Sequence, residues 1–189
     1  MPIAHPSVRS TAWRTCLLVS SLVFSTALAH ARTEPAAAVG VVRNVAWSPG
    51  DAQRDGACEF EIFLTVAQLQ QKHRAVGLVG VGNHNGRLSD QAEHALDNVA
   101  LRGIVVAKIA PSGGTVARTD EALFVDAGTL PESTACQLLQ TCIERYGPLP
   151  AVANPSRPTA AELRAIHRQL QRYQDAFTTA TSSAVAITN

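Results

Sequence analysis

The stretch VGLVGVGNHNGRL at residues 76–88 decides the fold of this chain. It begins with a short apolar run that stops at Gly82, and polar, turn-forming residues follow. A helical pattern that begins near Ser89 comes next. This order predicts a buried strand, a tight polar loop and a helix. Because ligands usually bind at the carboxyl ends of strands in α/β sheets, the loop amides Asn83 and Asn85 are the first candidate site residues.

The first 31 residues have the pattern of a secretory signal peptide. Arg9 and Arg14 give a positive start, an apolar run covers residues 16–28, and Ala29-His30-Ala31 fits a cleavage signal. The alternative, a membrane anchor, needs about 20 apolar residues, and this run is shorter. We therefore expect residues 1–31 to be removed and the protein to be periplasmic or secreted, with no membrane contact after cleavage.

The composition is that of a soluble globular domain. The chain has 189 residues, of which 46% are hydrophobic and 16% charged, and its formal net charge is +1. One domain is the default at this length. A nearly neutral balance without a basic cluster argues against nucleic-acid binding and against attraction to membrane surfaces.

Three cysteines remain after the leader: Cys58, Cys136 and Cys142. The last two lie six positions apart on a predicted helix, about 9 Å along its axis, so they cannot bridge each other. One of them could pair with Cys58, or they could be small core residues, and we favour the core for at least one. No close Cys/His pairing of metal-ligand type occurs, so we expect no metal and no cofactor.

Strand-like runs and helical patterns alternate along residues 39–150. We predict strands at residues 39–45, 76–81, 104–109 and 122–125. We predict helices at residues 65–74, 89–102 and 129–146, leave 60–64 undecided, and expect a loop up to residue 56. The alternation predicts an α/β fold, a three-layer doubly wound domain with a four-stranded, mostly parallel sheet.

Shorter segments flank this domain. We expect residues 32–38 to be an extended leader and residues 151–158 to be a Pro-rich linker. Thr159 and Glu162 form a capping box, which predicts a C-terminal helix over residues 159–178. Its apolar stripe is Leu163, Ile166, Leu170, Tyr173 and Phe177. We expect residues 179–189 to be a disordered tail.

Several charged or titratable residues have plain structural interpretations. His73, His94 and His167 lie on predicted helices among charged neighbours, so we interpret them as surface residues. Lys108 lies on a predicted buried strand, so we expect it to be paired or to lie near the open end of the strand.

Four motifs occur in order: VGVVRNVA at residues 39–46, GVGNHN at 80–85, GIVV at 103–106 and FVDAGTL at 124–130. Together they make residues 39–150 resemble the C-terminal domain of bacterial L-asparaginases, in the asparaginase/glutaminase family. In that family the second Asn of the Gly-Asn-Gly-Asn loop reaches the active site of the neighbouring subunit, and Asn85 matches it. A Glu from the hairpin before the last strand also contributes, and Glu121 is its nearest counterpart.

The resemblance therefore implies that Asn85 and Glu121 bind substrate, in trans, and that a small amino acid is a possible ligand. It also implies a homo-oligomer, or association with an asparaginase-type N-terminal domain. For Asn85 the alternative is a turn residue in a left-handed conformation.

The departures from the family concern catalysis. The family's nucleophilic Thr, in a Thr-Gly-Gly-Thr motif, its second Thr and its Lys belong to an N-terminal domain with no counterpart here. Residues 112–115 (Ser-Gly-Gly-Thr) and Thr119-Asp120 look like these motifs but lie elsewhere in the chain order. The family's Arg-Ser-Ser is replaced by Ala107-Lys108-Ile109. An activated Thr needs a base, an orienting group and an oxyanion hole, and the sequence shows none, so we expect no catalytic residue.

Two hypotheses follow, with a third as a simpler reading. The first is a secreted, catalytically silent domain that serves as an oligomerisation or ligand-contact module. The alternative is a residual L-asparaginase-type amidohydrolase that acts through a composite or split site. The third is a plain ligand-binding α/β module.

Overall fold

The computed structural model describes residues 37–43, 52–83, 86–111, 116 and 118–188, and for residues 52–58 and 183–188 it describes the backbone alone. All of these residues belong to the unit Thr33–Asn189. The predicted signal peptide, residues 1–31, lies outside the described residues. So do Asn85 and the Ser-Gly-Gly-Thr stretch at residues 112–115.

Four parallel strands form one sheet, in the order β1-β2-β3-β4. Their bounds are β1 Ala38–Arg43, β2 Val76–Val81, β3 Val105–Ile109 and β4 Val125–Asp126. The predicted α/β fold with a four-stranded parallel sheet is confirmed. The predicted position of the last strand was wrong, because residues 119–122 form a turn closed by a hydrogen bond from Ala122 N to Thr119 O (3.1 Å).

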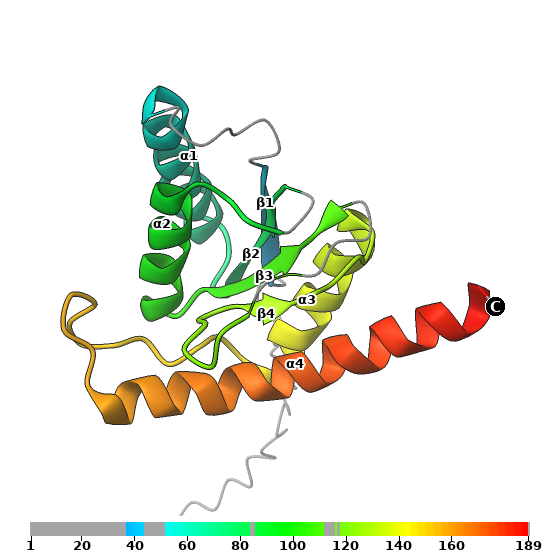
Figure 1. Ribbon diagram of the computed structural model, residues 1–189. Coiled ribbons are helices and arrows are strands. Elements are labelled where there is room, and N and C mark those ends of the chain that lie inside the picture. The colour runs from blue at the N-terminus through cyan, green and yellow to red at the C-terminus, as the bar shows by residue number, and fades with distance from the viewer. Residues whose placement is uncertain (1–36, 44–51, 84–85, 112–115, 117, 189) are drawn as a thin grey trace, which may run out of the picture. The chain divides into compact units, whose positions relative to one another are not determined.

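Helices cover both faces of the sheet (Figure 1). α1 (Ala52–Gln70) and α2 (Asp90–Leu101) lie on one face, and α3 (Glu132–Tyr146) lies on the other. The strands follow one another in a single direction, so crossovers of the same hand place α1 and α2 together. α3 follows the last strand and returns across the opposite face.

Two glycines let the helices approach the sheet closely. A Cβ at Gly40 of β1 would lie 2.7 Å from a methyl carbon of Thr65 on α1. A Cβ at Gly77 of β2 would lie 2.7 Å from Ile143 on α3. Since real Cβ contacts are longer, a larger residue at either position would force the facing side chains to shift, and glycine avoids this.

The expected loop up to residue 56 was wrong over residues 52–56, because α1 already begins at Ala52. The undecided residues 60–64 are also helical. Ile62 and Val66 are buried, and tertiary packing of this kind forms a helix whose local periodicity is weak. α1 ends at Gln70, so His73 lies beyond it and not on a helix.

The start of α2 and the end of α3 follow the predicted signals, whereas α3 begins at Glu132, three residues after the predicted start at residue 129. Ser89 caps α2, because its Oγ accepts a hydrogen bond from Ala92 N (3.2 Å). α3 stops at Gly147, which has φ +77° and donates its N–H to Ile143 O (2.9 Å). Glycine is preferred there because side chains rarely adopt this left-handed region.

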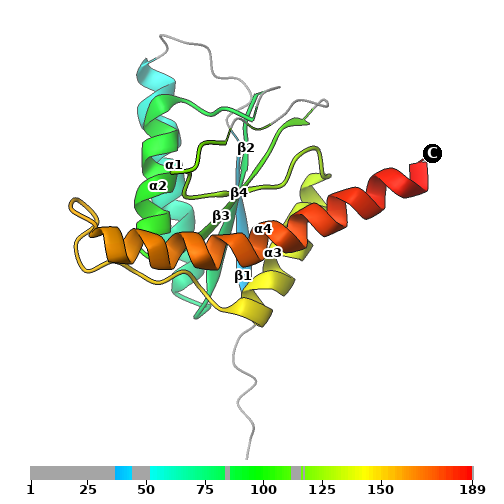
Figure 2. The same cartoon turned by 60° about the horizontal axis from the view of Figure 1, so that its bottom comes forward.

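α4 (Ala160–Thr188) lies along the edge strand β4 and against α3 (Figure 2). The capping box is confirmed: Thr159 N donates to Glu162 Oε2 (2.8 Å), and Glu162 N donates to Thr159 Oγ1 (3.3 Å). Of the predicted apolar stripe, Leu163 is half-buried and packs on the core, and four residues are fully buried: Ile166, Leu170, Tyr173 and Phe177.

The expected disordered tail at residues 179–189 was wrong up to residue 188, because α4 continues to Thr188. Hydroxyls of Thr179, Thr181 and Ser182 donate to the carbonyls four residues earlier, at 2.8 to 2.9 Å. In this way polar side chains that favour turns elsewhere are satisfied within the helix.

The predicted linker, residues 151–158, is fixed to the domain at its start. Val152 is buried and donates its N–H to Leu101 O (2.9 Å), and the preceding Leu149 N donates to Gly103 O (3.1 Å). This anchoring sets where α4 begins. Among the helices in the described part of the chain, none is long and apolar enough to cross a membrane.

Candidate functional site

The candidate site lies at the carboxyl edge of the sheet, where parallel strands end together. The last residues of the strands are Arg43, Val81, Ile109 and Asp126. β2 is an inner strand that is buried along its whole length, and the loop of residues 82–87 follows it directly. This is the edge where the sequence predicts a ligand.

Asn83 closes the base of this loop. Its N–H donates to Arg87 O (2.9 Å), its Oδ1 accepts from Arg87 N (3.2 Å), and its carbonyl accepts from Gly86 N (2.8 Å). Gly86 has φ +68°, and a Cβ at Gly82 would lie 2.4 Å from the carbonyl carbon of Gly86. Asn83 therefore shapes the turn by holding Gly86 and Arg87.

The structure describes only one of the two predicted substrate-binding residues, Glu121. Asn85 lies outside the described residues. Glu121 is exposed, in the turn before β4, and is not among the residues that line the neighbouring cavity described below.

Lys108 forms a buried ion pair, as expected. It is 4% exposed, and its Nζ donates to Glu93 Oε2 on α2 while it lies 3.9 Å from the centre of the Phe124 ring. The other carboxylate oxygen of Glu93 accepts from Leu88 N (3.0 Å). Both groups are thus used to join β3, the start of α2 and the segment before β4, and we assign them a structural role.

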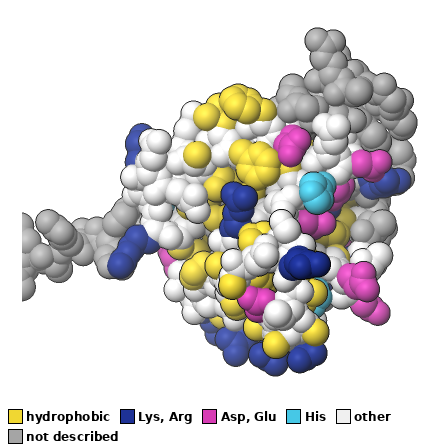
Figure 3. Space-filling model, turned by 90° about the vertical axis from the view of Figure 1, so that its left-hand side faces the viewer, with side chains coloured by type: hydrophobic (Ala, Val, Ile, Leu, Met, Phe, Trp, Pro, Cys, Tyr) yellow, Lys and Arg dark blue, Asp and Glu magenta, His cyan; other side chains and the backbone are white. Residues whose placement is uncertain are grey.

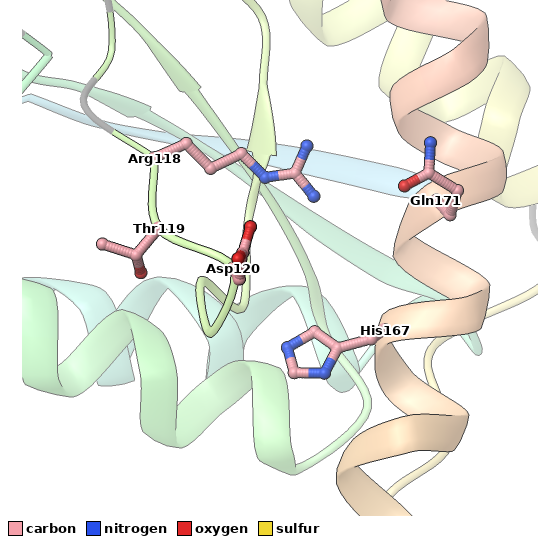
Figure 4. A pocket seen from close by; sticks show the side chains of 5 residues that line it. All are labelled: Arg118, Thr119, Asp120, His167 and Gln171. Carbon is pink, nitrogen blue, oxygen red and sulfur yellow. The ribbon is translucent and has the colours of Figure 1, made fainter.

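A polar cavity of about 300 Å³ separates the loop before β4 from α4 (Figure 4). Its lining residues are Arg118, Thr119, Asp120, His167 and Gln171. In Figure 4, Arg118 extends from the loop toward α4, and His167 extends from α4 toward the loop. Arg118 also donates to Gln174 Oε1 (3.0 Å).

His167 corrects the prediction that it is a plain surface residue. The residue is half-buried, and its Nε2 atom is buried without a hydrogen-bond partner. The sequence held one signal for this cavity: His167 and Gln171 are spaced by four on one helix, which places them on the same face. That this face lies opposite Thr119 and Asp120 depends on the packing of α4 and could not be read from the sequence.

One threonine hydroxyl does contact a carboxylate, at the start of α4. Thr159 Oγ1 donates to Glu162 Oε2 (2.6 Å). The hydrogen bonds from Thr159 and from Ala153 N lower the pKa of Glu162 to about 2. A carboxylate with so low a pKa is a weak base near neutral pH, so this pair caps the helix and does not activate a nucleophile.

The thiols and the possible metal ligands of the described residues add no second site. Burial raises the pKa of the Cys136 and Cys142 thiols, and both cysteines are free. Cys142 is 3% exposed and belongs to the core, as favoured for at least one of them. Within the described ranges, no three His, Cys, Asp or Glu side chains gather in a way that could hold a metal ion.

Comparisons with models of protein families, with curated proteins and with solved structures return no match for this chain.

Proposed function

We propose that this chain is a secreted, catalytically silent domain of the asparaginase C-terminal type that contacts a small amino-acid ligand through Asn85. The observation that carries the proposal is the place of the GVGNHN motif. It lies at the carboxyl end of an inner parallel strand, in a loop whose base Asn83 closes on Arg87. Asn83 and Gly86 are only three positions apart in the chain, so a ligand contact by Asn85 would be made at this edge of the sheet.

The order of the elements also supports the proposal. The four motifs of the resemblance fall on or directly after β1, β2, the start of β3 and β4, in that order. This agreement between the motif order and the strand order supports the resemblance. The spacing of the motifs and the topology of the sheet are consistent with one domain of this type.

The silent character is supported by how the polar groups near this edge are used. Lys108 is bound to Glu93, Arg43 is bound to Glu132 (2.5 Å) at the start of α3, and Asn83 is bound to its own turn. These contacts join elements of the fold or shape its turns, so we assign all three groups a structural role.

Thermal unfolding of the purified chain with L-aspartate tests the ligand contact. A ligand that binds only the folded state stabilises it, by about 2.7 kcal/mol at about 100 times Kd. We expect the unfolding temperature to rise with L-aspartate and this rise to vanish in Asn85→Ala. Asn154→Ala is the matched control, because Asn154 is an exposed amide in another turn, where it accepts from Ser156 N (3.1 Å). An equal rise in Asn85→Ala would exclude the proposed contact.

A second candidate, a residual amidohydrolase with a composite site, is favoured by one observation. Thr119 and Asp120, which look like the motif of the family's second Thr, line the polar cavity together with His167 (Figure 4). This function requires ammonia release from L-asparagine or L-glutamine that is lost in Thr115→Ala. Ammonia release that survives this substitution would point to a different nucleophile.

The proposed location has its own test. Export with cleavage after Ala31 leaves a protein that begins at Arg32. Mass spectrometry of the protein recovered from the periplasm or medium should find this N-terminus. Recovery of the uncleaved chain in the cytoplasm alone would contradict a secreted protein.

A further inference from the structure

The outer face of α1 and α2 carries an exposed aromatic residue beside an apolar groove. Phe60 is 68% exposed and Leu64 is 44% exposed, and these are the exposed large hydrophobic side chains of the described residues. Figure 3 views this face, on which hydrophobic side chains gather among acidic and basic ones. Single exposed hydrophobic residues are normal on soluble proteins, but exposed hydrophobic side chains beside an apolar groove with a charged rim form the pattern of an interaction site.

The groove lies between the carboxyl-terminal halves of the two helices. It has a volume of about 260 Å³, and its lining includes Phe63, Val66, Ala67 and Gln70 from α1 with Val99 and Arg102 from the end of α2. Its walls are largely apolar, with the Arg102 side chain at one end of α2. An aromatic ring flanked by acidic groups is therefore the kind of occupant that fits it.

The chain itself supplies that occupant. Phe60 lies seven residues before Ala67 on the same helix, about 10 Å along the axis. A two-fold axis that crosses α1 near Leu64 would pair two antiparallel copies of the helix. It would set Phe60 of each copy over Ala67, at the edge of the groove of the other, so that one contact forms twice.

Charge complementarity favours this pairing. α1 and α2 run in the same direction, and Arg102 lies level with the part of α1 that lines the groove. Glu59 lies four residues before the groove residue Phe63, and so on the same side of α1. The same two-fold axis would bring Glu59 level with Arg102 of the second copy. Neither Glu59 nor Arg102 has an ion pair within the described part of the chain.

We propose that the α1/α2 face is a self-association surface, in which Phe60 of each of two copies packs at the groove of the other and Glu59 pairs with Arg102. The proposal does not depend on the proposed ligand contact, because the face is formed by the outer sides of two helices and not by the loop of residues 82–87. The proposal concerns the oligomeric state in solution, so the test of ligand binding can fail while the dimer still forms.

Sedimentation equilibrium of the purified chain across a concentration series tests the proposal. We expect a reversible dimer whose dissociation constant rises at least about tenfold in Phe60→Ser, as for a central aromatic anchor. Because Phe60 is exposed, this variant should keep the unfolding temperature of the monomer fold, which circular dichroism would verify. A chain that stays monomeric throughout the series, or a dimer that Phe60→Ser leaves unchanged, would overturn the proposal.

Charge reversal identifies the partner face. Glu59→Arg and Arg102→Glu should each weaken the dimer, and the double variant should recover most of the loss, because the reversed charges again meet. Arg164→Glu, at an exposed position on α4, is the control and should leave the dimer unchanged. If the double variant is as weak as the two single changes combined, Glu59 and Arg102 do not meet and the proposed pairing is wrong. If neither single change weakens the dimer, the two copies associate through another face.

Discussion

At the residue scale, Glu93 and Lys108 form a buried ion pair near the carboxyl edge of the sheet. Lys108 is buried, and Glu93 neutralises it while also accepting the N–H of Leu88. Breaking a buried pair by removing one charge is costly, because the other charge stays buried without a partner.

Glu93→Gln should therefore destabilise the fold by about 2–4 kcal/mol, below the full cost of a wholly buried pair because Glu93 is partly exposed. Glutamine can still accept from Leu88, so the change isolates the charge. Urea unfolding measures the effect. Asp90→Asn is the control, since Asp90 is exposed and its contact with Arg87 is long (3.6 Å). If Glu93→Gln changes stability no more than Asp90→Asn does, the buried pair contributes nothing.

At the element scale, α4 protects the edge of the sheet. The Gln174 side chain accepts from Asp126 N (2.9 Å) and donates to Asp126 O (3.0 Å), so it bonds β4 in the way that a further strand would. An unprotected edge strand is a site for unwanted pairing with other chains.

Gln174→Ala removes both bonds to β4 and the contact with Arg118. We expect it to lower the free energy of unfolding by about 1–3 kcal/mol. Urea unfolding checks this value, with Gln171→Ala as the control, because Gln171 is exposed on the same helix and bonds only locally to Asp175 (2.8 Å). Equal effects of the two substitutions would mean that the bonds to β4 stabilise the fold no more than an exposed local bond does.

The start of α4 should be sensitive to acid. The folded-state pKa of Glu162 is about 2, below its ordinary value of 4.5. Its contribution is therefore complete above about pH 4.5 and is lost as the pH falls toward 2. Glu162→Gln should be less stable than the parent chain at neutral pH, and the difference should shrink over this window. A difference that stays constant from neutral pH down to pH 2 would contradict the shifted pKa.

The elements also show what the sequence can and cannot predict. Signals that act within a few residues, such as the Ser89 cap, the Thr159–Glu162 box and Gly147, gave the start of α2, the end of α3 and the start of α4 correctly. The start of α1 was missed because Ile62 and Val66 owe their burial to distant segments. The end of α4 was missed because the hydroxyls of its Thr and Ser residues bond to carbonyls within the helix, which the sequence pattern does not show.

At the scale of the whole molecule, the alternation of strands and helices was enough to predict a three-layer α/β domain. It was not enough to predict the polar cavity, because that cavity depends on α4 packing across the edge of the sheet and facing Thr119 and Asp120. His167 gains its buried Nε2 from this packing, and its charged sequence neighbours gave no sign of it. That β2 ends at Val81 and is followed by Gly82 and Asn83 at the carboxyl edge was predictable, because these residues are continuous in sequence; the ligand contact at this loop stays a prediction.

The central claim is that the chain binds a small amino acid through Asn85 and does not turn it over. Titration calorimetry of the purified chain with L-asparagine tests both parts in one measurement. We predict a saturable binding heat that returns to the baseline after each injection and is absent in Asn85→Ala. A continuing heat flow after injection, as hydrolysis would give, or equal binding by Asn85→Ala, would contradict the account.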